Sequence, residues 1–363
     1  MNNFAAILLL ASLCLLSSAL PAQQTLNADT TWNGSIVISE KITLAPRKTL
    51  YLKPGSRVIF QGQGSLQCQG KLIANDVVFL AEEGRMPGIA IQGEGEMHFN
   101  YCQFQDFSQG GGRYNLFLQI TRGRLFLQGC HFIRCAAIEY LYAGGQVEHC
   151  LFQDNQGIAL HLYHAKQVQV RYSTFWGGPK STHLLQLYAA QRCQVRDCFF
   201  YGGTSALRLG YGAKENLFSY LNLHNQTIGV DIHGNDNKEN LLQNLLVTDS
   251  RSVAVRLESA AATNLFVSCI FFRSHIGAIN ASQSPGVSFR QSIFLQHKNL
   301  LLGKDPEQPD FQDNVFWETK LPTELAKLLL KQGSKNRQEK PALLNPEKLL
   351  FSAAGLTEFL QAE

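Results

Sequence analysis

One short pattern recurs along most of the chain. It has the form apolar-x-x-small-x-Phe, and about 20 to 28 residues separate successive copies. A period of this length is typical of solenoids, in which each repeat forms one coil and the coils stack. The small position of the pattern falls at Val77, Cys102, Cys130, Cys150, Ser173, Cys198, Leu221, Leu245, Cys269, Ser292 and Asn314.

The two flanking positions of the pattern are apolar in every copy. Two residues after the small position stand Phe79, Phe104, Phe132, Phe152, Phe175, Phe200, Leu223, Val247, Phe271, Phe294 and Phe316. Three residues before it stand Ala74, Phe99, Leu127, Val147, Val170, Val195, Phe218, Leu242, Phe266, Phe289 and Phe311. We therefore expect like residues to lie above like in neighbouring coils, with strands about 4.8 Å apart.

Each copy also contains a second segment in which apolar and polar side chains alternate, as in GIALHL, residues 157–162. Alternation with a period of two indicates a strand that buries one face and leaves the other in water. On this basis His161 should face solvent, while Ile158, Leu160 and Leu162 point inward. Three short strands per coil and three parallel sheets follow from the pattern.

Eleven copies in one register resemble the right-handed parallel β-helix of the pectin-lyase-like superfamily. The resemblance covers roughly residues 40–318 and implies an all-β, three-sheet solenoid of about 11 coils. It also implies that a polysaccharide binds on one sheet, because members of the superfamily usually bind polysaccharide there. We expect the β-helix to occupy residues 23–318.

The two ends of the chain differ from the repeat. Residues 1–22 contain the uncharged run LLLASLCLLSSAL before a small-residue exit, which predicts a cleaved signal peptide and a secreted or periplasmic protein. No other segment is apolar enough to predict a membrane span. Residues 319–363 are predicted to form a C-terminal cap of short helices, the first with Thr323 as its N-cap and Gly333 after its last turn. These helices would cover the last coil or dock a partner.

Two further columns have a structural interpretation. Eight cysteines remain after the predicted cleavage, and those at the small position are expected to be stacked, buried thiols. Disulfides are the alternative, for which the off-column Cys68, Cys135 and Cys193 are the better candidates. A ladder of side-chain amides at one bend is predicted from Asn216, Asn240 and Asn264.

The outward positions of the alternating strand define a polar file along one sheet. The alanines Ala90, Ala159, Ala206 and Ala254 should share its face, so we expect a shallow groove. The file is interpreted either as a binding track or as a ladder of opposite charges that stabilises the sheet alone. Its members are Gln92, Gln119, Glu139, His161, Gln186, Arg208, Asp231, Arg256 and Asn280.

Aromatic and basic side chains beside this file suit sugars, since rings stack on sugar faces and forked donors bind hydroxyls and carboxylates. Tyr163, Tyr188 and Tyr211 come just past the strand, with His164 and His233 nearby. The catalytic candidates are His161, Arg208, Asp231 and Arg256. The substrate-binding candidates are Glu139, Tyr163, Gln186, Tyr188, Tyr211, His233 and Asn280.

Two reactions fit these candidates. In β-elimination on a uronate, Arg208 or Arg256 would neutralise the substrate carboxylate, and His161 or Tyr188 would transfer the proton. In glycoside hydrolysis, Asp231 and Glu139 would form the carboxylate pair. The sequence thus predicts a protein that binds an extracellular polysaccharide. It leaves open whether the protein also cleaves the polymer, as a lyase or glycoside hydrolase, and whether the polymer is acidic. The competing interpretation is a non-catalytic scaffold or surface-interaction protein.

Neither a cofactor nor a metal is predicted. The sequence lacks the acidic cluster that binds calcium in pectate lyases and the combined motifs of polygalacturonases. Residues 229–236, GVDIHGND, collect Asp, His and Asn in a way that could hold a metal ion, but such a segment is more often a turn. The net charge of +4 comes without a basic run, so a nucleic-acid partner is not expected. The oligomeric state is not predicted.

Overall fold

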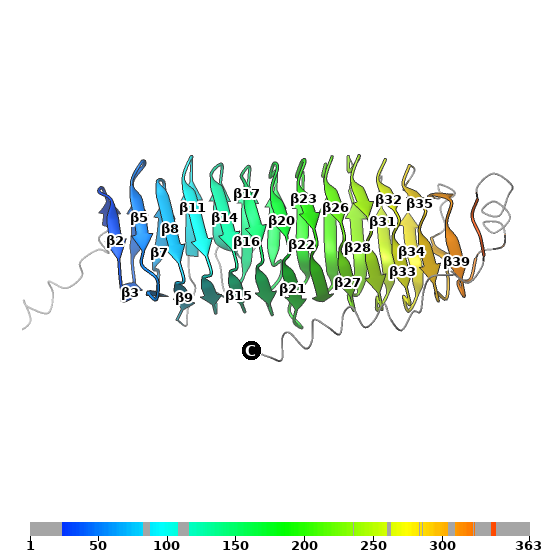
Figure 1. Cartoon of the computed structure of the whole chain (residues 1–363), viewed down its shortest axis with the longest axis horizontal. Coiled ribbons are helices and arrows are strands. Elements are labelled where there is room, and N and C mark those ends of the chain that lie inside the picture. The colour runs from blue at the N-terminus through cyan, green and yellow to red at the C-terminus, as the bar shows by residue number, and fades with distance from the viewer. Residues whose placement is uncertain are drawn as a thin grey trace, which may run out of the picture.

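Three long parallel sheets wrap around one continuous core and give the molecule an elongated shape (Figure 1). The structure is a computed structural model of the whole chain. It describes residues 24–82, 88–107, 116–234, 236–259, 263–282, 284, 286–303, 309–321, 323 and 335–338. Each sheet contains 13 strands, and every strand pairs in parallel with the equivalent strand of the neighbouring coil. The described residues contain no helix among their named elements.

The chain visits sheets A, B and C in turn once per coil. Sheet A consists of β1 (Gln24–Leu26), β4 (Lys41–Leu44), β7 (Ser65–Cys68), β10 (Gly88–Gln92), β13 (Leu116–Thr121), β16 (Ala137–Leu141), β19 (Leu160–Tyr163), β22 (His183–Tyr188), β25 (Ser205–Gly210), β28 (Ile228–His233), β31 (Val253–Glu258), β34 (Gly277–Ser282) and β37 (Leu301–Leu302). Sheet B consists of β2 (Thr30–Trp32), β5 (Thr49–Leu52), β8 (Lys71–Asn75), β11 (Glu96–Asn100), β14 (Arg124–Gln128), β17 (Gly144–Glu148), β20 (Gln169–Arg171), β23 (Gln194–Arg196), β26 (Leu217–Ser219), β29 (Leu241–Gln243), β32 (Leu265–Val267), β35 (Ser288–Arg290) and β38 (Asp310–Gln312). Sheet C consists of β3 (Ser35–Ile38), β6 (Arg57–Phe60), β9 (Val78–Ala81), β12 (Gln103–Gln105), β15 (His131–Ile133), β18 (Leu151–Gln153), β21 (Thr174–Gly177), β24 (Phe199–Gly202), β27 (Asn222–His224), β30 (Leu246–Thr248), β33 (Ile270–Phe272), β36 (Ile293–Leu295) and β39 (Val315–Trp317).

The eleven sequence repeats correspond to the eleven strands of sheet C from β9 to β39, and β3 and β6 precede them. The inward phenylalanines stack as predicted. The ring centroids of Phe132 and Phe152 are 4.9 Å apart, and those of Phe152 and Phe175 are 4.5 Å apart with an angle of 3° between the planes. Offset stacking of this kind adds about 0.5–1.5 kcal/mol per pair to the burial of the rings.

The predicted asparagine ladder is confirmed at the bend that leads into sheet B. Asn240 Oδ1 accepts hydrogen bonds from the backbone N–H of Asn216 (3.1 Å) and from its side-chain amide (2.9 Å). Asn264 Oδ1 accepts the same two bonds from Asn240, at 3.2 and 2.8 Å. Because these groups are buried, the ladder satisfies backbone donors that no strand partner reaches.

Buried thiols, rather than disulfides, fill the cysteine positions. All eight cysteines in the described residues are free and buried, including the off-column Cys68, Cys135 and Cys193 that were candidates for bridging. Their sulfurs lie against backbone carbonyls, as between Cys130 Sγ and Phe99 O at 3.2 Å. Burial raises the pKa of Cys68 to about 12 and that of Cys193 to about 11. The thiols therefore act as small core side chains.

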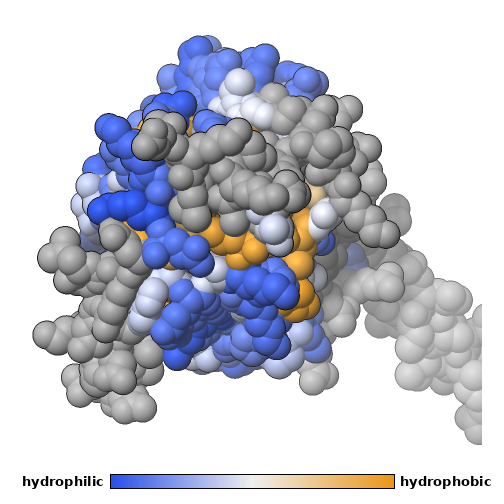
Figure 2. Space-filling view, turned by 90° about the vertical axis from the view of Figure 1, so that its right-hand side faces the viewer, coloured by the Kyte–Doolittle hydropathy of each residue, from blue (hydrophilic) through white to orange (hydrophobic). Residues whose placement is uncertain are grey.

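The C-terminal end of the solenoid presents its core edge-on. Figure 2 shows hydrophobic residues in the middle of this face and hydrophilic residues around it. An end of this kind requires a cover. The predicted capping helices fall mostly on residues 324–334 and 339–363, which lie outside the described residues, as does the predicted signal peptide. Within the described residues, no helix is long and apolar enough to cross a bilayer.

The first prediction concerns the thiols. In the chain without residues 1–22, a thiol reagent should leave all eight cysteines unmodified in the native state, because they are buried and their pKa values are raised. The same reagent should titrate eight thiols after denaturation without reductant. A count of six or fewer would mean that disulfides form and would contradict the core described above.

The second prediction concerns His297, which is 2 % exposed. Its Nδ1 accepts a bond from Ser274 N at 3.2 Å and its Nε2 contacts Phe271 O at 3.0 Å, so the ring is neutral. Burial lowers its pKa from 6.5 to about 4. The unfolded chain therefore binds this proton more readily, and stability should be complete above pH 6.5 and fall towards pH 4, by up to about 3 kcal/mol.

Urea unfolding of the wild type and His297→Asn at pH 7 and pH 4.5 measures this contribution. The pH-dependent loss of stability should shrink in His297→Asn but persist in the control His275→Asn, because His275 is exposed. An equal loss in all three proteins would contradict the assignment.

Candidate functional site

The register of sheet A brings most of the predicted polar file into one column. Gln119, Glu139, His161, Gln186, Arg208, Asp231, Arg256 and Asn280 occupy the same position on consecutive strands. The prediction that Gln92 is the first member of this column is wrong. Ala90 is the residue in register with Gln119, and Gln92 pairs with Thr121. The charged residues thus follow one another at the strand spacing of about 4.8 Å.

The prediction that His161 faces solvent is also wrong. His161 alternates with the inward Leu160 and Leu162, but its side chain is 0 % exposed. Its Nδ1 lies 2.9 Å from Glu139 Oε2, and Glu139 Oε1 accepts a bond from Gln119 Nε2 at 2.9 Å. A side chain that points away from the core is therefore not always in contact with water.

Strict alternation fails at the start of the sheet A strands. Ala159, Ala206 and Ala254 belong to the hydrophobic core and not to the outer face. The reason is visible in β22 and β25, where the register passes from His183–Ser205 directly to Leu185–Leu207. Ala206 and Leu207 both point inward, so parity changes between them. The same change makes Ile158 line an outer hollow, although an inward position was predicted for it.

A buried carboxylate between two guanidinium groups forms the centre of the site. Arg256 donates to Asp231 in bidentate fashion, from Nε to Oδ1 at 2.8 Å and from Nη2 to Oδ2 at 2.7 Å. Arg208 Nε lies 3.5 Å from Asp231 Oδ2. The Asp231 side chain is 0 % exposed, whereas those of Arg208 and Arg256 are 25 % and 33 % exposed. Two positive charges thus share one negative charge, and the arginines keep their outer edges in water.

Two imidazoles flank Arg208. Its Nη1 contacts Nε2 of His183, and its Nη2 lies 3.2 Å from Nε2 of His233. His183 Nδ1 is 2.6 Å from Ser205 Oγ, and His233 Nε2 is 2.9 Å from the Tyr188 hydroxyl. Because a guanidinium group can only donate, the Nε2 of His183 must be unprotonated, and its Nδ1–H then donates to Ser205.

Both imidazoles have lowered pKa values. Burial, followed by the nearby Arg208 guanidinium, lowers the pKa of His183 from 6.5 to about 4. Burial and Arg208 also lower the pKa of His233, against the opposing effect of Asp231. Both rings are therefore neutral at pH 7 and can accept a proton.

An open hollow of about 660 Å³ lies beside this cluster. Gln186, Tyr188 and Arg208 reach it from the strands, together with His183. Aromatic groups border it at the bend towards sheet B, where Tyr211 is 62 % exposed. Its full lining is Ile158, Tyr163, His164, Thr182, His183, Gln186, Tyr188, Ala189, Arg208 and Tyr211.

The structure therefore brings together most of the predicted site. Arg208, Gln186, Tyr163, Tyr188 and Tyr211 line the hollow, and Asp231, Arg256 and His233 support Arg208 from behind or beside it. His161 and Glu139 form a separate buried pair, and Asn280 lies one strand beyond Arg256.

Sequence reasoning missed His183 and Ser205. Both stand at the first position of their strands, where the alternation that identified the file has already broken down. A search for basic residues two to three positions before the file would have found His183.

The predicted hydrolytic pair does not have the required spacing. Glu139 and Asp231 are separated by four strand steps, about 19 Å, whereas glycosidase carboxylates stand about 5–10 Å apart. Among the described residues, no group of three or more His, Cys, Asp or Glu is placed to hold a metal ion.

Comparisons with known proteins identify the fold. No protein-family model matches the sequence, and no curated protein matches it. A double mutant of the periplasmic alginate epimerase AlgG superimposes with a TM-score of 0.67 and 9% identity, over 80% of this chain and 84% of that one. The AlgG crystal structure without mutations gives 0.59 and 10%, over 82% and 84%. The Agl-KA catalytic domain gives 0.53 and 12%, over 78% of this chain and 62% of that one. Together with the three parallel sheets, these likenesses show that the chain has the right-handed parallel β-helix fold.

Proposed function

We propose that this protein binds an acidic polysaccharide in the hollow of sheet A and removes the C5 proton of a uronate residue. The observation that carries the proposal is Arg208, which a buried Asp231 holds between two neutral imidazoles at the edge of an open hollow. Both AlgG structures compared above are named as structures of an alginate epimerase, and alginate is a polyuronate. That likeness supports the choice of substrate class.

Carboxylate recognition follows from the charges of the cluster. Arg208 and Arg256 together carry two positive charges, and Asp231 compensates one of them. The remaining positive charge lies at the partly exposed edge of Arg208, beside the hollow. A guanidinium group binds a carboxylate through two parallel N–H donors, so Arg208 would orient the uronate as well as neutralise it. Neutralising this carboxylate makes the adjacent C5–H more acidic.

His183 would act as the base. In the free protein its Nε2 accepts a hydrogen bond from Arg208 Nη1. A bound carboxylate would take that donor in place of the imidazole, which frees the Nε2 lone pair. It would also cancel the charge that helps to lower the pKa of His183, and so make the imidazole a stronger base. Substrate binding would thus itself make His183 a stronger base.

The Tyr188 hydroxyl, which is hydrogen bonded to His233, would act as the acid that donates a proton after His183 has removed one. The C5 proton passes to His183, and the electron pair moves into the carboxylate as an enolate. If the glycosidic oxygen at C4 leaves, it takes the Tyr188 proton and an unsaturated uronate forms. If C4 keeps its substituent, a proton returned to C5 from the opposite face gives the epimer. Both outcomes share the same first step.

The aromatic border suits a sugar chain. The ring of Tyr211 stands at right angles to those of Tyr188 and His233, at centroid distances of 5.3 and 5.5 Å. Tyr163 and His164 continue this border on the preceding coil, with centroids 4.6 Å apart. Amphipathic rings in this position offer apolar faces to the C–H groups of sugars and leave the hydroxyls free to hydrogen bond. Export through the predicted signal peptide, residues 1–22, is part of the proposal and would bring the protein to extracellular polymers.

A second candidate function is a non-catalytic scaffold. It is favoured by one observation, namely that Asp231 is fully buried and that its pairing with both arginines also stabilises the sheet without any ligand. A protein that is folded and binds no member of a broad polysaccharide panel would favour this candidate.

The third prediction tests the shared chemical step. In D₂O, the wild type should remove the C5 proton from the uronates of alginate or polygalacturonate. NMR detects this step as deuterium at C5 if the outcome is epimerisation, and as the unsaturated uronate without a C5 hydrogen if the outcome is elimination. Arg208→Ala and His183→Ala should each lower the rate of C5 proton removal by at least about 100-fold, as expected for the loss of a charge-stabilising or proton-transferring group.

The matched control is Arg192→Ala, which removes an exposed arginine that pairs with Glu215 and does not belong to the lining of the hollow. It should keep the wild-type rate. If His183→Ala and Arg208→Ala also keep that rate, the assignment of the site is wrong.

The fourth prediction concerns pH. Because the base must be neutral, the acid limb of kcat/KM should report the pKa of His183 in the free protein, which burial and Arg208 lower to about 4. The rate should therefore rise with pH through about 4 rather than through the ordinary histidine value of 6.5. An acid limb centred near 6.5 would contradict the role given to this histidine.

A further inference from the structure

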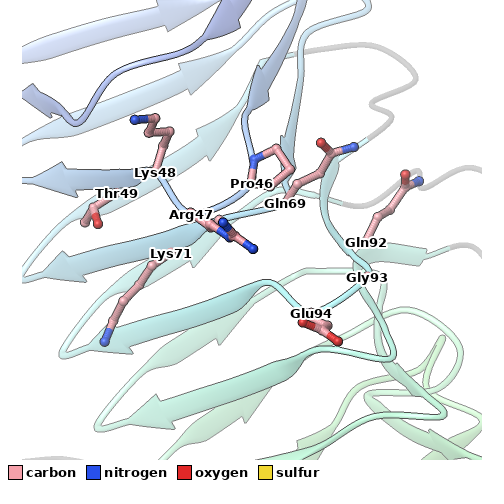
Figure 3. A pocket seen from close by; sticks show the side chains of 10 residues that line it. Pro46, Arg47, Lys48, Thr49, Gln69, Lys71, Gln92, Gly93 and Glu94 are labelled. Atoms are coloured by element: carbon pink, nitrogen blue, oxygen red, sulfur yellow. The ribbon is translucent and has the colours of Figure 1, made fainter.

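A second hollow, of about 780 Å³, lies at the bend between sheets A and B near the N-terminal end of the solenoid. It spans the three coils that contain β4–β5, β7–β8 and β10–β11. Figure 3 shows Arg47 in the middle of the hollow, with Lys48 and Lys71 on one side and Gln69, Gln92 and Glu94 on the other. A Cβ on Gly70, which also lines the hollow, would lie 2.1 Å from Lys48 O, so no residue with a side chain fits at this position.

The lining of this hollow carries more positive than negative charge. Lys71 lies 3.6 Å from Glu96, whose other oxygen is 3.3 Å from His98 Nε2. Burial would raise the pKa of Glu96, but His98, Lys71 and Arg124 together lower it, so this carboxylate is compensated by its own neighbours. Glu94 remains in the lining. Within the described part of the chain, neither Arg47 nor Lys48 forms an ion pair.

The second hollow lies on the same edge of the molecule as the proposed active site. The second hollow lies at the bend between sheets A and B, and the hollow at Arg208 reaches the same bend at Tyr163, Ala189 and Tyr211. The two hollows, near β7 and β22, are five strand steps apart, about 24 Å. Between them the same bend carries further cations, with Arg122 after β13 and Lys166 after β19. A polymer that follows this edge from Arg208 therefore meets positive charge along its path.

We infer that the hollow around Arg47, Lys48 and Lys71 is a distal anion subsite, which holds carboxylates of the same polysaccharide chain whose uronate is bound at Arg208. This inference rests on the proposed function. It adds that the protein recognises a polyanionic chain long enough to bridge about 24 Å, and that short oligosaccharides occupy only the hollow at Arg208. Two sites on one chain raise the affinity for the polymer through effective concentration, without a new contact at the active site.

The experiment compares two double variants that each remove one lysine and one arginine from the same end of the solenoid. Arg47→Ala/Lys48→Ala changes the lining of the hollow. Lys53→Ala/Arg57→Ala changes exposed cations at the bend between sheets B and C of the same coil, and neither of these residues lines the hollow. Thermal melting establishes that both fold. Binding of alginate or polygalacturonate, and of a trisaccharide of the same uronate, is then measured by calorimetry at low salt, with dextran as a neutral probe.

Arg47→Ala/Lys48→Ala should weaken polymer binding about three- to tenfold, in line with the loss of two partly exposed ion pairs. It should leave trisaccharide binding within twofold of wild type, and Lys53→Ala/Arg57→Ala should change neither. Equal polymer affinity in the two double variants would overturn the distal subsite while leaving the proposed function intact. Failure of the wild type to bind any polyuronate would instead overturn the proposed function, and the distal subsite with it.

Discussion

The structure depends on the vertical stacking of identical positions in successive coils. A parallel strand pair holds residues about 4.8 Å apart, a spacing at which flat rings stack and branched side chains interlock. The phenylalanines of the core column lie near this distance, with centroids 4.7 Å apart between Phe79 and Phe104 and 4.9 Å apart between Phe104 and Phe132. A shift of one residue in any strand would turn its inward side chains to the outside, so the core selects a single register for every coil.

The same register determines the chemistry of the outer face. Once Leu207, Val230 and Val255 are aligned inside, Arg208, Asp231 and Arg256 must follow one another outside. Opposite charges on adjacent strands allow Asp231 to be buried, because Arg256 provides a bidentate partner for it. The rigid sheet then fixes Arg208 between two imidazoles without the help of a loop. A site built in this way is already organised before a ligand arrives, which lowers the entropic cost of binding.

Much of this arrangement could be predicted from the sequence, because the repeat reports the register directly. The phenylalanine stack, the amides of Asn216, Asn240 and Asn264, and the buried cysteines all depend only on which positions coincide. The column from Gln119 to Asn280 could be predicted for the same reason. The prediction failed where coils differ in length or strands are irregular. Gln92 was misaligned by two residues, since β10 offers two candidate outward positions, and Ala206 was placed outside because parity changes at the start of β25.

Burial and local pairing were harder to predict than register. Alternation shows that His161 points away from the core, but not that it is enclosed with Glu139. In the same way, the side-chain directions that bring His183 to Arg208 depend on the bend before β22, and no periodic signal describes that bend. Whether a side chain points inward or outward could thus be predicted from the alternation in the sequence. Which outer side chains contact one another could be seen only in the three-dimensional structure.

A crystal structure of the protein with a bound uronate oligosaccharide tests the central claim most directly, because it shows the register and the ligand together. We expect Arg208, Asp231 and Arg256 on consecutive strands, with a sugar carboxylate on the guanidinium group of Arg208 in place of His183. Strands shifted by one residue, or a sugar seated on another face with Arg208 still bonded to both histidines, would contradict the account.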